Sequence, residues 1–182
     1  MSKNTETIPV RRTTWTSDLP VAEVVARLDS VVHASTSEDK VWPILAEAKS
    51  KAEIDEQLDA IGGEGFNFLL FSKFSASTFL RTYQSTPDAE PVPDAHVYAI
   101  GNPRFGELVM RDSLLASLYV PRRLIVMGRT ADPGSGTHIV YDELESIIVR
   151  EGAGAGLVKK ARLLDTKTEE VIQRVLLDGA KD

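Results

Sequence analysis

The fold is decided by residues 96–148, which read HVYAIGNPRFGELVMRDSLLASLYVPRRLIVMGRTADPGSGTHIVYDELESII. Residues 96–100 alternate in polarity and are rich in strand formers. Gly101 ends this strand, Asn102 is a favourable helix N-cap, and Pro103 suits the first helical position, where its missing N–H costs nothing. The sequence therefore predicts a strand that turns directly into a helix.

The second half of the stretch predicts a β-hairpin. Pro121 ends the preceding helix, and residues 122–130 that follow are mostly apolar and of strand length. The segment 132–136, DPGSG, is a strong turn signal, because proline presets φ and glycine supplies positive φ. Residues 137–142 then form the returning strand.

In a hairpin centred on that turn, side chains alternate between two faces. One face holds Leu124, Val126, Ile139 and Tyr141, and the other holds Arg123, Ile125, Met127, His138, Val140 and Asp142. The second face combines apolar side chains with convergent polar groups. This composition is typical of a ligand pocket.

Several motifs resemble the family of the domain of unknown function numbered 302, DUF302. They are Gly101-Asn102-Pro103, Leu118-Tyr119-Val120-Pro121 with Arg123, Gly136-Thr137, Tyr141-Asp142 with Ser146 close behind, and Gly65-Phe66 before an apolar strand. The resemblance covers about residues 10–148. It implies a compact α+β domain, found in bacteria and fungi, and it implies no general biochemical activity.

We expect an α+β fold with two layers and a C-terminal helical extension. A mainly antiparallel five-stranded sheet would consist of residues 10–16, 66–72, 96–100, 122–130 and 137–142, with helices packed on one face. Residues 66–71 are apolar throughout, which indicates burial on both faces and a central position in the sheet.

The expected organisation is a disordered N-terminus (1–9), a DUF302-like domain (10–150), a glycine-rich joint (151–156) and a helical tail (157–182). The tail carries an apolar stripe that must be buried on its own sheet or on a second subunit. Thr166 and Glu169 have the spacing of a capping box, which favours two helices in the tail.

Composition restricts the functional classes. The 182 residues are 42% hydrophobic and 26% charged, as in a soluble globular domain. A net charge of −6 argues against a nucleic-acid partner. The absence of cysteine excludes disulfides and thiolate chemistry. The N-terminus lacks the apolar core of a signal peptide, and no apolar run is long enough to cross a membrane. We expect a cytoplasmic protein without a membrane partner.

No catalytic or cofactor motif is present, and we expect no cofactor and no metal. The leading hypothesis is non-catalytic binding of a small apolar or amphipathic molecule. The candidate site residues are Asn102, Arg123, Ile125, Met127, His138, Tyr141 and Asp142. Arg123 would either pair with Asp142 or hold an anionic group of the ligand.

Two alternatives stay open. In the first, the chain would be an enzyme that uses acid–base chemistry at His138, Asp142 and Tyr141. In the second, it would be a structural protein that forms a homodimer through its C-terminal helices.

Overall fold

The computed structural model describes residues 1–65, 67–84 and 90–177. Its centre is a five-stranded antiparallel sheet with the strand order β1-β5-β4-β3-β2. The strands are β1 (Arg12–Ser17), β2 (Leu69–Ser75), β3 (Ala95–Gly101), β4 (Arg122–Gly128) and β5 (Thr137–Asp142). The expected fold class is confirmed. Phe66, the first residue of one expected strand, lies outside the described residues, as do residues 178–182 of the tail.

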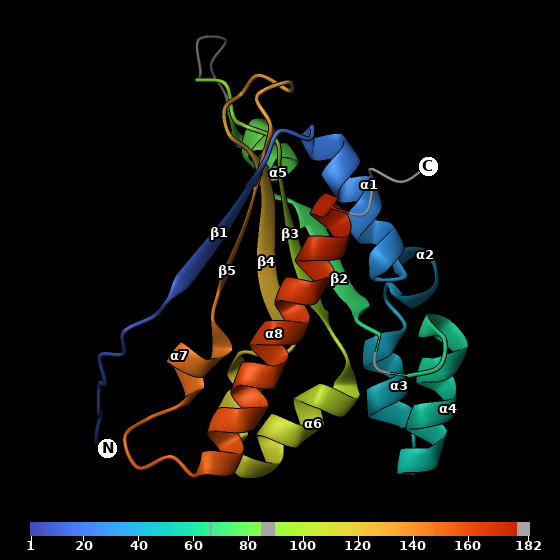
Figure 1. Cartoon of the computed structure of the whole chain (residues 1–182), viewed down its shortest axis with the longest axis vertical. Helices are drawn as coiled ribbons and strands as arrows, with labels where there is room; N and C mark the ends of the chain where they lie inside the picture. Colours follow the sequence, from blue (N-terminus) through green and yellow to red (C-terminus); the bar gives the residue numbers. More distant parts are fainter. Residues whose placement is uncertain (66, 85–89, 178–182) are drawn as a thin grey trace.

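Helices surround the sheet, and two of them form the second layer. The helices are α1 (Val21–Val31), α2 (Ala34–Ser37), α3 (Val41–Glu47), α4 (Lys51–Gly62), α5 (Ala76–Tyr83), α6 (Pro103–Asp112), α7 (Leu144–Ile148) and α8 (Ala155–Leu177), with a 3₁₀ turn η1 (Leu114–Leu118). Helices α1 and α8 contact each other and cross the same face of the sheet (Figure 1). The Asn102 side chain caps α6 by accepting a bond from the N–H of Arg104, with Pro103 in the first turn, as the sequence predicts.

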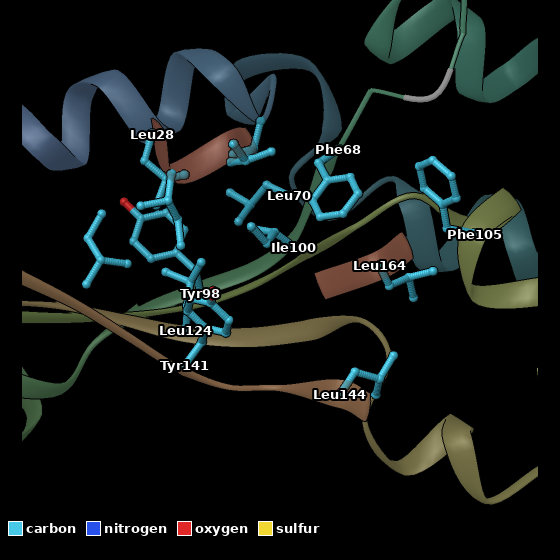
Figure 2. Close-up of a cluster of buried hydrophobic side chains, with 14 of the residues drawn as sticks. Leu28, Phe68, Leu70, Tyr98, Ile100, Phe105, Leu124, Tyr141, Leu144 and Leu164 are labelled. Atoms are coloured by element: carbon cyan, nitrogen blue, oxygen red, sulfur yellow. The ribbon is translucent and has the colours of Figure 1, made fainter. Parts of the chain in front are cut away.

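The main core lies between this helical layer and the sheet. Figure 2 shows Leu28 of α1 above Tyr98 of β3 and Leu124 of β4, with Leu164 of α8 further along. Burying such side chains stabilises the fold by about 1.5–3 kcal/mol each. Helix α8 contributes six buried apolar residues to this core: Leu157, Ala161, Leu164, Val171, Ile172 and Val175. The apolar stripe of the tail is therefore covered by the same chain.

The tail forms one helix through the point where the capping-box spacing favoured a break. Thr168 interrupts the apolar stripe, yet it is fully buried and its hydroxyl donates to the carbonyl of Leu164 one turn earlier. This internal bond satisfies the hydroxyl without a change in helix direction. The expectation of two helices is wrong for this reason.

Strand β2 is an edge strand, which corrects the expected central position. Its first residues Leu69, Leu70 and Phe71 are buried because helices cover them from several sides. Leu70 packs in the main core, whereas Leu69 and Phe71 pack in a second cluster with residues of α3 and α4. A continuous apolar run indicates that a strand is buried on both faces. In β2 this burial comes from the surrounding helices and not from a central position in the sheet.

A buried ion pair joins α8 to the sheet. The Asp165 carboxylate lies 3.1 Å from Nη2 of Arg122, whose exposed fraction is 3%. It also accepts bonds from the N–H groups of Leu144 (2.7 Å) and Glu145 (2.9 Å) at the start of α7. The same guanidinium donates to the carbonyl of Asp142. One carboxylate thus holds α8, α7 and the β4–β5 pair together.

Burial dominates the electrostatics of this pair. It raises the pKa of the Asp165 carboxyl and lowers the pKa of the Arg122 guanidinium, although each charge favours the other. Both shifts have the direction that desolvation of a charged group produces. The two charges depend on each other, because either one alone would be buried without compensation.

We predict that Asp165→Ala lowers the free energy of unfolding by about 3–5 kcal/mol, because it leaves Arg122 buried without an anion and the first turn of α7 without a cap. Urea denaturation followed by circular dichroism measures this loss. The paired variant Arg122→Met/Asp165→Leu removes both charges and should lose less than Asp165→Ala. An equal or larger loss in the paired variant would contradict the assignment of the cost to the unpaired charge.

Candidate functional site

The hairpin of β4 and β5 has the alternation that the sequence predicts. Leu124 faces Tyr141 across the ladder, Val126 faces Ile139, and all four side chains are buried beneath the helices. The intervening residues point to the other face of the sheet and are exposed or partly exposed. Candidate site residues on β4 and β5 therefore divide according to the face on which they lie.

A polar row crosses one end of this open face. Arg12 of β1 faces Asp142 of β5, Arg123 of β4 faces Ala99 of β3, and Ala99 faces Ser72 of β2. The register Leu124–Tyr141, extended by one residue, brings Arg123 opposite Asp142. Residues from all five strands thus form one line on the same face.

Four residues of the row, Ser72, Ala99, Arg123 and Asp142, form the floor of a hollow of about 730 Å³. This volume lies within the range of about 300–1,000 Å³ that is usual for small-molecule pockets. The residues around the hollow come from the N-terminal segment, α3, the sheet, the η1–β4 connection and α7: Ile8, Val10, Trp42, Ser72, Ala99, Ser117, Leu118, Tyr119, Val120, Pro121, Arg122, Arg123, Asp142 and Ile147.

Two small residues explain why the sheet is hollowed here. Ser72 and Ala99 extend little from the floor, while larger side chains rise around them. Trp42 stands at the margin with its ring edge-on to Phe71, the two centroids being 5.0 Å apart. Such an edge-to-face pair fixes the orientation of the indole. The hollow therefore has a polar floor and a rim that includes exposed apolar side chains.

The charges on the floor are unequally satisfied. Asp142 accepts two bonds from Arg12, at 2.7 Å to Nε and 3.1 Å to Nη2, which is the bidentate geometry of a strong pair. The Arg123 side chain is exposed and has no hydrogen bond or ion pair with any residue in the described ranges. The expected pair of Arg123 with Asp142 is thus replaced by that of Arg12 with Asp142. A free guanidinium remains beside a neutralised carboxylate.

The other candidate residues lie outside the hollow. Ile125, Met127 and His138 share its face of the sheet but are further along the strands, and His138 Nδ1 lies 3.1 Å from the hydroxyl of Thr16. Asn102 is buried and uses its amide to cap α6 and to donate to the carbonyl of Asn67. These four residues do not contact the hollow.

Tyr141 points away from the open face. It is buried on the helical side, where its hydroxyl lies 3.4 Å from Glu169 of α8. Burial raises the pKa of this hydroxyl above its ordinary value. His138 and Asp142 lie on the opposite face, because they alternate with Tyr141 along β5. The three residues of the acid–base hypothesis are therefore not brought together.

The histidines of the sheet also stay apart. His96 faces Val126 on the helical side, and its Nε2 lies 3.3 Å from Asp94. Asp94 in turn accepts a bond from the buried hydroxyl of Ser77 at 2.7 Å. No group of three or more histidine and acidic residues suited to a metal occurs within the described part of the chain.

Sequence reasoning missed the residues that form the walls. Leu118 and Tyr119 belong to the Leu118-Tyr119-Val120-Pro121 motif of the family resemblance, so a signal for them was present. Trp42 gave only a weak signal, a tryptophan beside a proline in a polar stretch. Its contact with Phe71 of β2 depends on tertiary packing across about 30 residues of chain, which local patterns do not encode.

The fold is that of an α+β domain similar to a known structure. The chain resembles an uncharacterised conserved protein, DUF302, from Bacillus stearothermophilus, with a TM-score of 0.59 over 90% of this chain and 97% of that one. The identity is 13%, so the likeness concerns the fold. No protein-family model matches the sequence, and no curated protein is significantly similar to it. Among the described residues, no helix has the length and apolar character needed to span a bilayer.

Two adjacent arginines should differ in how strongly the same substitution lowers the stability of the fold. We predict that Arg123→Gln changes the free energy of unfolding by less than about 0.5 kcal/mol, because its guanidinium has no partner. Arg122→Gln should cost about 3 kcal/mol or more, since it leaves Asp165 buried without a cation. Parallel urea titrations of the two variants measure the difference. Similar losses would show that Arg123 has a structural role.

Proposed function

We propose that this chain binds small amphipathic anions in the hollow, without catalysing their conversion. The single observation that supports the proposal is the unpaired guanidinium of Arg123 on the floor of a depression whose rim includes exposed apolar side chains. A carboxylate or phosphate group suits the planar donor array of arginine, which binds such groups in a bidentate manner.

The walls favour a ligand with an apolar body. Leu118 is 72% exposed, Trp42 50% and Val10 43%, and all three lie at the hollow. Exposed apolar side chains gathered around a depression mark a binding surface, because covering them releases about 25 cal/mol per Å² of apolar area. An apolar tail against this rim and an anionic head at Arg123 would use both features of the site.

Asp142 does not oppose this arrangement. Its charge is compensated by the two bonds from Arg12, so an incoming anion meets one cation in excess on the floor. Ser72 lies in the same row and supplies a hydroxyl that donates or accepts. The polar groups orient the head, and the rim selects the tail.

The test compares dodecanoate, kept below its critical micelle concentration, with dodecanol, kept below its solubility limit, by isothermal titration calorimetry. We predict that the wild-type chain binds dodecanoate and that Arg123→Gln weakens this binding about tenfold, the loss of one charge-assisted hydrogen bond. Binding of dodecanol, which has no charge, should be unaffected by the same substitution.

Ala99→Leu is the matched steric variant, because a larger side chain on the floor would fill the hollow without changing its charge. It should abolish binding of both probes, with circular dichroism confirming the fold. The proposal fails if the wild-type chain binds neither probe, or if Arg123→Gln binds dodecanoate as well as the wild type does.

A further inference from the structure

The two edges of the sheet are protected unequally. At the β2 edge, the N–H of Leu70 donates to the carbonyl of Val32 and to the hydroxyl of Ser37, each at 3.0 Å. The pairing of β2 is further broken by a register shift between Leu70 and Ser72, and the strand carries Lys73. Cover by other elements, irregular pairing and a lysine are devices that keep edge strands from pairing with other chains.

The β1 edge has none of these devices. β1 pairs with β5 without a register shift from Arg12 to Ser17. Apart from this ladder, its residues make no backbone–backbone hydrogen bond within the described parts of the chain. Figure 1 shows β1 as the outermost strand on its side of the sheet.

The composition of β1 also favours pairing. Its sequence, RTTWTS, contains three threonines and a tryptophan, and it lacks proline, glycine and lysine. β-Branched and aromatic residues are the best strand formers. A regular edge of this kind is a template for another strand, since the outward N–H and C=O groups of an edge strand are unpaired.

We propose that β1 pairs with β1 of a second copy of this chain, antiparallel, to give a continuous ten-stranded sheet. A two-fold axis perpendicular to the sheet brings together residues of the same face, so the positions of opposed residues differ by an even number. With the axis at Trp15, Arg12 lies opposite Asp18 of the second copy, and Thr14 lies opposite its Thr16.

Charge identifies the second copy as the occupant. Arg12 is 67% exposed and Asp18 is 96% exposed, although each also has a partner in its own chain, Asp142 and Arg129. The strand thus begins with an exposed cation and is followed by an exposed anion. In two antiparallel copies, Arg12 of each copy lies opposite Asp18 of the other, so this pair of opposite charges forms twice. A register centred on Thr14 would oppose Arg12 to a threonine and lose both contacts.

This arrangement leaves the proposed ligand site accessible. The axis through Trp15 keeps the helices of both copies on the same side of the joined sheet, because it is perpendicular to that sheet. The open faces with their hollows therefore stay uncovered. The pairing also differs from a homodimer through the C-terminal helices, since the apolar stripe of α8 is buried in its own chain.

The experiment uses two charge reversals of the full-length chain, Arg12→Asp and Asp18→Arg, measured by sedimentation velocity over a range of concentrations. We expect the wild type to form dimers and each variant to raise the dimer dissociation constant about tenfold or more, because each opposes like charges twice. An equimolar mixture of the two variants should restore dimers, since every contact then joins opposite charges.

Glu151→Arg is the control, a charge reversal at an exposed turn away from β1, and it should leave the dissociation constant unchanged. Thermal melting of each variant separates loss of pairing from loss of folding. A monomeric wild type at every concentration would overturn the proposal. So would a wild-type dimer that withstands both reversals, or a mixture of the variants that stays monomeric.

Discussion

The Asp165 carboxylate is the interaction on which the arrangement of the layers depends. It reaches from α8 to the guanidinium of Arg122 on β4 and to two N–H groups at the start of α7. Hydrophobic contacts alone specify that α8 covers the sheet, but they are non-directional and tolerate sliding. A buried charge that needs all of its partners fixes one position along the sheet, because any shift leaves a charge or an N–H group without compensation.

This position of α8 determines which face of the sheet remains open. Helices α1 and α8 together cover the face that carries Tyr98, Leu124 and Tyr141 (Figure 1). Within the described parts of the chain, no helix of comparable length lies across the opposite face. On that side, residues of the N-terminal segment, α3, η1 with its connection to β4, and α7 lie around one end of the sheet. The small side chains of Ser72 and Ala99 then leave a depression that these surrounding elements enclose.

Local patterns predicted most of the fold. Alternation and the DPGSG turn gave the hairpin and its faces, and Asn102-Pro103 gave the start of α6, because each depends on residues close in sequence. The same alternation places Tyr141 on the covered face, so its assignment to the site conflicted with the predicted register. The partners of Arg122 and Asp142 were not predictable, since Asp165 and Arg12 lie 43 and 130 residues away. Local patterns do not encode such contacts.

Arg122 and Arg123 illustrate how alternation along one strand places two identical neighbouring residues in different environments. The sequence shows two equivalent arginines after a proline, and a strand directs successive side chains to opposite faces. The side chain beneath the helices, Arg122, needs a carboxylate partner, because burying an isolated charge in the core costs a large free energy. The side chain on the open face is hydrated and needs no partner, so it stays available. The sequence alone does not show which of the two arginines is free, because this depends on the register of β4 and β5. Once the register is known, Arg123 is the arginine on the open face, and the proposed binding of anions rests on it.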